Sequence, residues 1–211
     1  MAGIHYEDTV TPGTIAIASL SRARRIKRNG FTGVMSFENQ GQRLSKSLRF
    51  HRRPAPEQII LVAEDLDEPD GLTKVPVEFD AVRILEFGRR HANGALLVHC
   101  NAGISRSSAA ALAILADRMG DGHEQDALSE MLRLRPCAVP NLLIVRHADN
   151  LLGRGGKLLD AVMAFDAASP WCQWRRIANA AAARGERLPP WPPGLEVPGE
   201  DDADGLVEQR T

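Results

Sequence analysis

Four short apolar segments in the first half of the chain have the pattern of β-strands. Residues 14–20 (TIAIASL) alternate like a half-buried strand, and residues 32–37 (TGVMSF) form a second such segment. Residues 58–63 (QIILVA) and 95–99 (ALLVH) are short continuous apolar runs, which are typical of strands buried on both faces. Four strands are therefore predicted.

Segments with a helical period lie between these strands and then follow the last of them. The basic segment at residues 21–30 (SRARRIKRNG) predicts a short helix ended by Asn29-Gly30, and residues 75–91 predict a longer helix. Further helices are predicted at residues 107–119, 124–134, 140–152, 157–168 and 170–184. This order indicates an α/β fold, with a central, mostly parallel sheet flanked by helices and a helical C-terminal half.

Length and composition fit one globular domain with a short appendage. The chain has 211 residues, of which 44% are hydrophobic and 25% charged. We expect a domain over residues 1–168 and a C-terminal extension over residues 169–211. The extension begins as an amphipathic helix, and its five prolines between residues 189 and 198, followed by an acidic run, predict a disordered tail.

Charge and cysteine usage narrow the function classes. The net charge of −1 gives no overall field that would attract nucleic acid or an anionic membrane. Three scattered cysteines form neither a disulfide framework nor a zinc motif, and the histidines lack ligand spacing, so no metal is expected. Reduced cysteines, no signal-like N-terminus and no apolar run of about 18 residues predict a cytoplasmic protein with no membrane partner. The sequence leaves the oligomeric state open.

Charge is nevertheless uneven along the chain. Residues 22–53 are strongly basic, whereas the stretch from Gly199 onward is acidic. The basic segment has two readings: a solvated helix face, or a collar that attracts phosphorylated substrates.

The segment LLVHCNAGISRSS, at residues 96–108, has the pattern of a strand, a tight loop and a helix start. Backbone N–H groups of such a loop can converge on an anion, and a helix N-terminus favours negative charge. Cys100 would lie at the base of this cradle, a setting that stabilises a thiolate. Gly103 permits the sharp turn, and the planar fork of Arg106 can clasp two oxygens of a tetrahedral anion. These residues together indicate phosphoryl transfer.

The motif HCNAGISRS resembles the HCx5R-Ser/Thr signature of the cysteine-dependent protein tyrosine and dual-specificity phosphatases. The resemblance spans about residues 14–165 and implies the sandwich fold of that superfamily. It implies that Cys100 is the nucleophile, Arg106 the phosphate clamp and Ser107 the residue that assists the departing sulfur, while His99 orients the loop. The phosphate would be held by the loop residues Asn101, Ala102, Gly103, Ile104, Ser105 and Arg106.

Two further segments agree with this resemblance. The family's general acid is an Asp on an upstream loop, and EDLDEPD follows the third strand here. We assign the role to Asp65, with Asp67 and Asp70 as alternatives. The stretch RLRPCAVPN resembles the one that packs beneath the phosphate loop in compact members, where Arg135 and Asn141 would act as supports. The combination looks most like a bacterial branch of predicted tyrosine phosphatases.

The resemblance implies a phosphomonoesterase that hydrolyses phosphotyrosine, and with it phosphoserine or phosphothreonine, through a cysteinyl phosphate and without a cofactor. The uncharged loop interior favours a phosphorylated protein over a phosphoinositide or an RNA 5′ end. Two alternatives stay open: a pseudophosphatase that binds phosphopeptides, and a phosphatase for a small phosphorylated metabolite.

Overall fold

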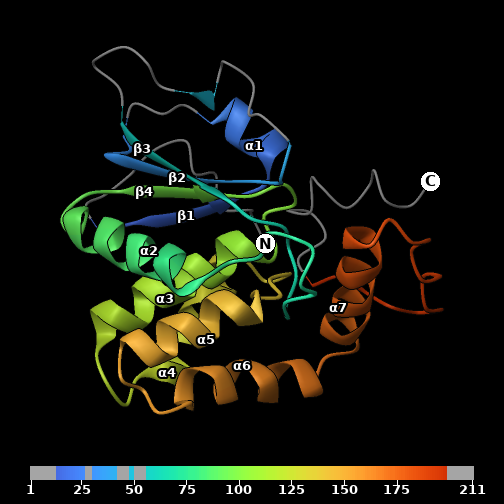
Figure 1. Cartoon of the computed structure of the whole chain (residues 1–211). Helices are drawn as coiled ribbons and strands as arrows, with labels where there is room; N and C mark the ends of the chain where they lie inside the picture. Colours follow the sequence, from blue (N-terminus) through green and yellow to red (C-terminus); the bar gives the residue numbers. More distant parts are fainter. Residues whose placement is uncertain (1–12, 27–29, 42–47, 50–55, 199–211) are drawn as a thin grey trace.

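The computed structural model describes residues 13–26, 30–41, 48–49 and 56–198. Its centre is a sheet of four parallel strands in the order β1-β4-β2-β3 (Figure 1). The strands are β1 (Ile15–Ala18), β2 (Gly33–Glu38), β3 (Glu57–Val62) and β4 (Leu96–His99). All four predicted strands occur, and the parallel sheet confirms the predicted fold class.

The two faces of the sheet are covered differently (Figure 1). On one face, Ile15 and Ile17 of β1 belong to the main hydrophobic core; on the other, Ala16 and Ala18 pack with Ala23. This side-chain alternation matches the period-two pattern of the sequence. The short helix α1 (Leu20–Arg25) covers the second face and ends earlier than predicted, because Ile26 is already extended.

The main core is closed by five helices. They are α2 (Glu78–Arg90), α3 (Arg106–Met119), α4 (Glu124–Leu134), α5 (Leu142–Leu151) and α6 (Lys157–Ala167). Helix α3 is buried along nearly its whole length and is rich in alanine, which allows close approach of its neighbours. It begins directly after the loop that carries Cys100, so the packed core positions that loop.

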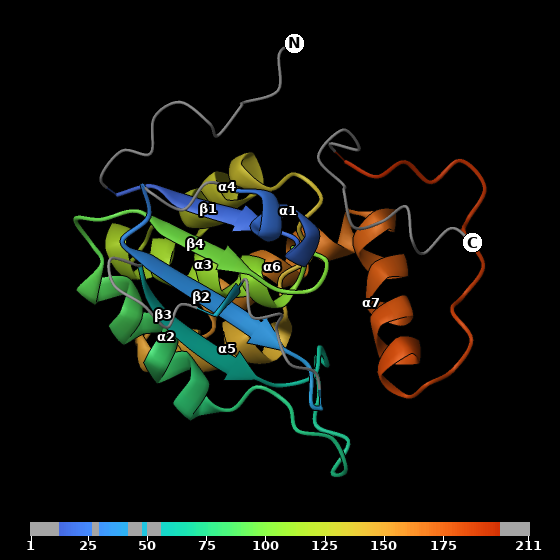
Figure 2. The ribbon, with the colours of Figure 1, turned by 90° about the horizontal axis from the view of Figure 1, so that it is seen from above.

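The C-terminal extension begins with α7 (Pro170–Ala183), which stands beyond the carboxyl ends of the strands (Figure 2). Residues 185–198 do not agree with the predicted disorder, because they pack back on α7. The Trp174 indole donates to the Pro190 carbonyl at 3.1 Å, the Trp174 and Trp191 rings meet edge to face, and Val197 is buried. Apolar burial of the tryptophans outweighs the loop-like composition.

Of the two charged segments singled out in the sequence, the structure describes only a part of the basic one. The acidic stretch 199–211 lies outside the described residues, as do residues 27–29, 42–47 and 50–53 of the basic segment. Of the part that is described, Arg49 forms an ion pair with Glu38 at the end of β2. The two readings of the basic segment therefore stay predictions.

Candidate active site

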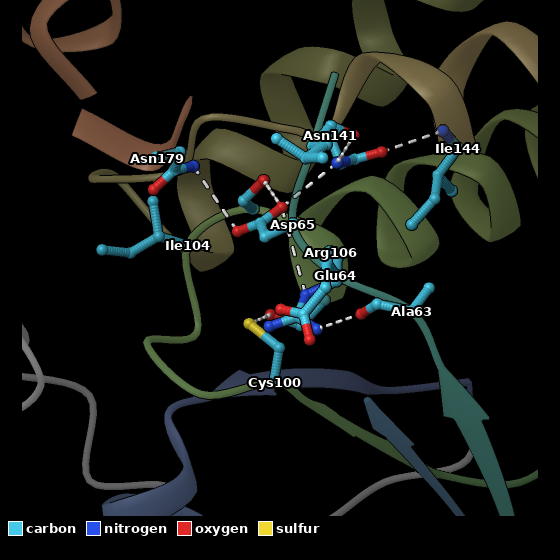
Figure 3. Close-up of polar contacts among 12 residues, drawn as sticks. Ala63, Glu64, Asp65, Cys100, Ile104, Arg106, Asn141, Ile144 and Asn179 are labelled. Carbon is cyan, nitrogen blue, oxygen red and sulfur yellow. Dashed lines mark hydrogen bonds and ion pairs between the residues drawn. The ribbon is translucent and has the colours of Figure 1, made fainter. Parts of the chain in front are cut away.

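The phosphate loop, residues 100–106, joins the carboxyl end of β4 to the start of α3 (Figure 3). The Cys100 thiol is buried, and its Sγ accepts a hydrogen bond from the Gly103 amide at 3.2 Å. Ser107 Oγ lies 3.2 Å from the same sulfur. A backbone donor and a hydroxyl therefore converge on Sγ, an arrangement that stabilises negative charge there.

Gly103 is required by the shape of this loop. Its φ is +69°, in the left-handed region, and a Cβ would lie 2.5 Å from the backbone of Ala18 and Ser19. The loop is also tied to the first strand–helix junction, because the Leu20 amide donates to the Asn101 carbonyl at 3.0 Å. Only a residue without a side chain allows this close approach.

The phosphate loop is supported from the segment between α4 and α5. Arg135 is buried and its Nε donates to the Gly103 carbonyl at 3.0 Å, while the Val139 amide donates to the Ile104 carbonyl at 2.9 Å. These bonds turn loop carbonyls away from the cradle and leave amides for an anion. Arg135 thus lies where the sequence resemblance placed a support.

His99, directly before Cys100, is fully buried and its Nε2 lies 2.8 Å from Ser36 Oγ on the neighbouring strand β2. Burial lowers the pKa of His99 to about 4, so the ring is neutral at pH 7. The side chain ties the end of β4 to β2 and contributes no charge to the site.

Arg106 is buried, with only 2% of its surface exposed, and its Nη1 donates to the Ala63 carbonyl at the end of β3. Its Nε lies 4.0 Å from Oδ1 of Asp65. The guanidinium is therefore held in one orientation between the phosphate loop and the acid loop, which we define as residues 63–77. Such orientation is what a bidentate phosphate clamp needs.

The three candidate acids have different surroundings. Asp65 faces the phosphate loop: its Oδ1 accepts from Ser105 Oγ at 2.7 Å and from Asn141 Nδ2 at 3.1 Å. Asp67 instead pairs with Arg176 at 2.9 Å and accepts from the Leu142 amide, and burial raises its pKa. Asp70 is exposed and bonds to its own turn through Thr73. The structure thus places Asp65, and neither alternative, against the phosphate loop.

Asn141 holds Asp65 and α5 together. Its Nδ2 also donates to the Leu66 carbonyl at 2.8 Å, and its Oδ1 caps α5 by accepting from the Ile144 amide at 3.1 Å. Figure 3 shows Asn141 and Asn179 approaching Asp65 from two sides. Asn141 is therefore a positioning residue for the acid loop as well as a helix cap.

Sequence reasoning did not identify the contribution of α7. Arg176 bridges Asp67 and Asp166 and donates to the Pro140 carbonyl at 3.1 Å, and Asn179 Nδ2 lies 3.4 Å from Asp65 Oδ2. The available signal was the i, i+4 spacing of Arg175 and Asn179, which places both on one helix face. The spacing alone does not show which part of the protein this face of α7 packs against.

These elements line a partly open cavity of about 150 Å³. The phosphate loop contributes Asn101, Ala102 and Arg106 to its wall. Helix α7 contributes Arg175, Ala178, Asn179, Ala182 and Ala183, and the remaining lining residues are Asn39, Glu64, Asp65 and Leu188. Of the other residues predicted to bind phosphate, Ser105 donates through its Oγ to Asp65, and Ile104 packs in a hydrophobic cluster with Trp171 and Trp174. That their backbone amides bind phosphate stays a prediction.

The other two cysteines, Cys137 and Cys172, are buried and form no disulfide. Burial raises the pKa of Cys172 to about 11, so this thiol stays protonated at neutral pH. In the described part of the chain, no group of three His, Cys, Asp or Glu side chains could hold a metal ion. Within the same residues, no helix combines the length and the apolar character needed to cross a bilayer.

Comparison with solved structures finds similar folds. A crystal structure of DUSP15 matches with a TM-score of 0.50 and 23% identity over 74% of this chain and 94% of that chain. A crystal structure of human DUSP28 matches with a TM-score of 0.48 and 20% identity, over 76% of this chain and 100% of that chain. A crystal structure of Tk-PTP in the active form matches with a TM-score of 0.47 and 20% identity, over 71% of this chain and 95% of that chain. No family model and no curated protein matches the sequence. The chain has the fold of the dual-specificity and protein tyrosine phosphatases.

Proposed function

We propose that the protein is a phosphomonoesterase that uses Cys100 as its nucleophile. The observation that carries this proposal is the arrangement on one short loop of a buried Cys100 sulfur, which accepts from the Gly103 amide, and an Arg106 guanidinium held between Ala63 and Asp65. A nucleophile, donors for equatorial oxygens and an acid are the parts that phosphoryl transfer needs.

In the first step, the Cys100 thiolate attacks phosphorus in line and the ester P–O bond breaks. Asp65 gives its proton to the departing oxygen, while Arg106 and the loop amides hold the three equatorial oxygens. In the second step, the oxygen of a water molecule attacks the phosphorus of the cysteinyl phosphate, and Asp65 takes a proton from that water. The P–S bond then breaks and inorganic phosphate leaves. Ser107 Oγ, 3.2 Å from Sγ, donates to the sulfur as it regains negative charge.

Phosphotyrosine is the proposed substrate, with phosphoserine and phosphothreonine as weaker ones. The uncharged side chains of Asn101 and Ala102 at the cavity wall support a phosphoprotein over a polyanionic lipid. None of the three cysteines forms a disulfide, which supports a reducing compartment, the cytoplasm.

A small phosphorylated metabolite is the second candidate. The cavity of about 150 Å³ has the volume of roughly five water molecules. Among the described residues that line it, none is aromatic, whereas three are asparagines. That wall suits a compact polar leaving group. A pseudophosphatase is less well supported, because the chain retains Cys100, Arg106 and Asp65 as candidates for the nucleophile, the clamp and the acid.

The test is hydrolysis of p-nitrophenyl phosphate and of a phosphotyrosyl peptide by the purified protein, compared with its Cys100→Ser variant. We expect turnover by the wild type and loss of more than 99% of it in the variant. Vanadate should still bind Cys100→Ser, because the cradle consists of backbone amides and Arg106. If Cys100→Ser kept more than about 1% of the wild-type turnover, Cys100 would be excluded as the nucleophile. A wild-type protein that bound vanadate but hydrolysed neither compound would be a pseudophosphatase.

A further inference from the structure

The carboxyl group of Asp65 has acceptor positions on both oxygens, about two on each, and three of them have donors. Oδ1 accepts from Ser105 Oγ at 2.7 Å and from Asn141 Nδ2 at 3.1 Å. Oδ2 accepts from Asn179 Nδ2 at 3.4 Å and has no second donor within the described part of the chain. The position left for a proton on Asp65 is therefore on Oδ2.

The two oxygens also differ in their surroundings. Ser105 and Asn141, which donate to Oδ1, are 2% and 0% exposed, and neither is among the described residues that line the cavity. Asn179, which donates to Oδ2, does line the cavity, as does Asp65 itself. Figure 3 shows that Asn179 and Asn141 reach Asp65 from different sides. Oδ2 is thus the oxygen on the cavity side of Asp65.

The Asn179 amide is committed to this one contact. The residue is 9% exposed, and among the described residues its side chain has a single hydrogen-bond partner, Asp65. Its neighbours on the α7 wall of the cavity include Ala178 and Ala182, whose side chains cannot donate in its place. The last torsion of an aspartate side chain is intrinsically broad, so donors on both oxygens are needed to fix the plane of its carboxyl group.

We propose that Asp65 delivers its proton from Oδ2 and that Asn179 is the positioning residue that aims this oxygen at the departing oxygen of the substrate. The inference rests on the proposed function and adds a residue of the C-terminal extension to its acid step. As the ester P–O bond breaks, its electron pair takes the proton and the O–H bond of Asp65 breaks. The bond from Asn179 Nδ2 then strengthens, because Oδ2 has become negatively charged.

The test is Asn179→Leu, which keeps roughly the size of the side chain and removes the amide. We expect kcat/KM for an alkyl phosphate to fall about tenfold, which is a part of the 10²–10⁴-fold that general acid catalysis contributes. For p-nitrophenyl phosphate, the loss should be under about twofold. The basic limb of the pH–rate profile should move to higher pH, because a donor to the carboxylate favours the ionised form and its removal lets Asp65 keep its proton longer.

The other charged and titratable groups near Asp65 are unchanged in this variant, so the shift of the limb reports the amide. They are Arg106 and Cys100 of the phosphate loop, Glu64 and Asp67 of the acid loop, and Arg175 of α7.

Two further variants serve as controls. Asn179→Gln keeps an amide, one methylene further out, and should restore part of the alkyl rate. Gln173→Leu makes the matching change on the same helix, at an exposed amide that donates to the Ala167 carbonyl at 3.0 Å, and should alter neither rate nor the basic limb. If Asn179→Leu does not fold, Asn179→Ala decides in its place, because alanine is the strongest helix former.

The outcomes separate this inference from the proposed function. An active wild type whose alkyl rate and basic limb are unchanged in Asn179→Leu would overturn the role of Asn179 and leave the phosphatase intact. An equal loss for both substrates with an unmoved limb would also overturn it, since Asn179 would then only support the fold. A wild type that hydrolyses neither substrate would overturn the proposed function, and the acid step would fall with it.

Discussion

Arg176 of α7 lies 2.9 Å from Asp67 of the acid loop, although 109 residues separate them in the sequence. The same guanidinium pairs with Asp166 at the end of α6 and donates to the Pro140 carbonyl. The C-terminal extension therefore holds the acid loop against the phosphate loop, two residues from Asp65. The extension is part of the site and not an appendage to it.

Loss of this link should impair the acid more than the nucleophile. In Arg176→Met, we expect kcat/KM for an alkyl phosphate to fall about 10- to 100-fold, which is a part of the 10²–10⁴-fold that general acid catalysis contributes. For p-nitrophenyl phosphate, whose leaving group needs little protonation, the loss should be under about threefold. Rates across a series of aryl phosphates measure this dependence.

Two variants control the Arg176 experiment. Arg176→Lys keeps a cation between Asp67 and Asp166 and should restore part of the alkyl rate. Arg133→Met removes an exposed ion pair with Glu130 and should change neither rate. An equal loss for all leaving groups in Arg176→Met would mean that the link supports the whole fold and has no particular effect on the acid.

Among the three loop acids, Asp65 alone should show the signature of a general acid. We expect Asp65→Asn to lower alkyl phosphate hydrolysis by about 10²–10⁴-fold and to flatten the basic limb of the pH–rate profile. Asp70→Asn should have little effect, because Asp70 is exposed and caps its own turn. If Asp67→Asn showed the stronger leaving-group dependence, the acid would be Asp67.

Gly103 and Gly153 have nearly equal φ values, +69° and +67°, but different surroundings. An alanine at 153 meets open space, so Gly153→Ala should cost about 1–2 kcal/mol of unfolding free energy from φ alone. An alanine at 103 would also collide with the Ala18 and Ser19 backbone. We expect Gly103→Ala to be less stable in urea than Gly153→Ala and to lose phosphatase activity. Equal stabilities would mean that the loop shifts freely.

His99 should make the protein less stable as the pH falls from about 6.5 to 4. Burial lowers the folded-state pKa to about 4, so in this window the unfolded chain binds the extra proton and the folded state does not. The loss by pH 4 is about 3 kcal/mol. Urea unfolding at several pH values measures it. In His99→Gln, this loss of unfolding free energy between pH 6.5 and 4 should disappear. In His123→Gln, which changes an exposed histidine, the loss should remain.

Local patterns were sufficient to predict the strands, the order of helices and the phosphate loop. Alternation in residues 14–20 indicated which side chains of β1 face each side of the sheet, and the run from His99 to Ser107 places Cys100, Gly103 and Arg106 within one strand–loop–helix unit. The strand alternation and the strand–loop–helix unit depend only on residues that are close in the sequence, and the spacing of those residues determines the local geometry. The choice of Asp65 came from its position after a strand, but three acids share that loop.

Only the tertiary structure decided which acid meets the phosphate loop and what the extension does. Asp65 is distinguished by Ser105, Asn141 and Asn179, which lie 40, 76 and 114 residues away in the sequence. The proline-rich residues 185–198 pack because Trp171, Trp174 and Trp191 bury one another, an effect that composition does not reveal. Contacts of this kind depend on how helices pack around a shared core, and the pattern along one helix specifies an apolar face without specifying its partner.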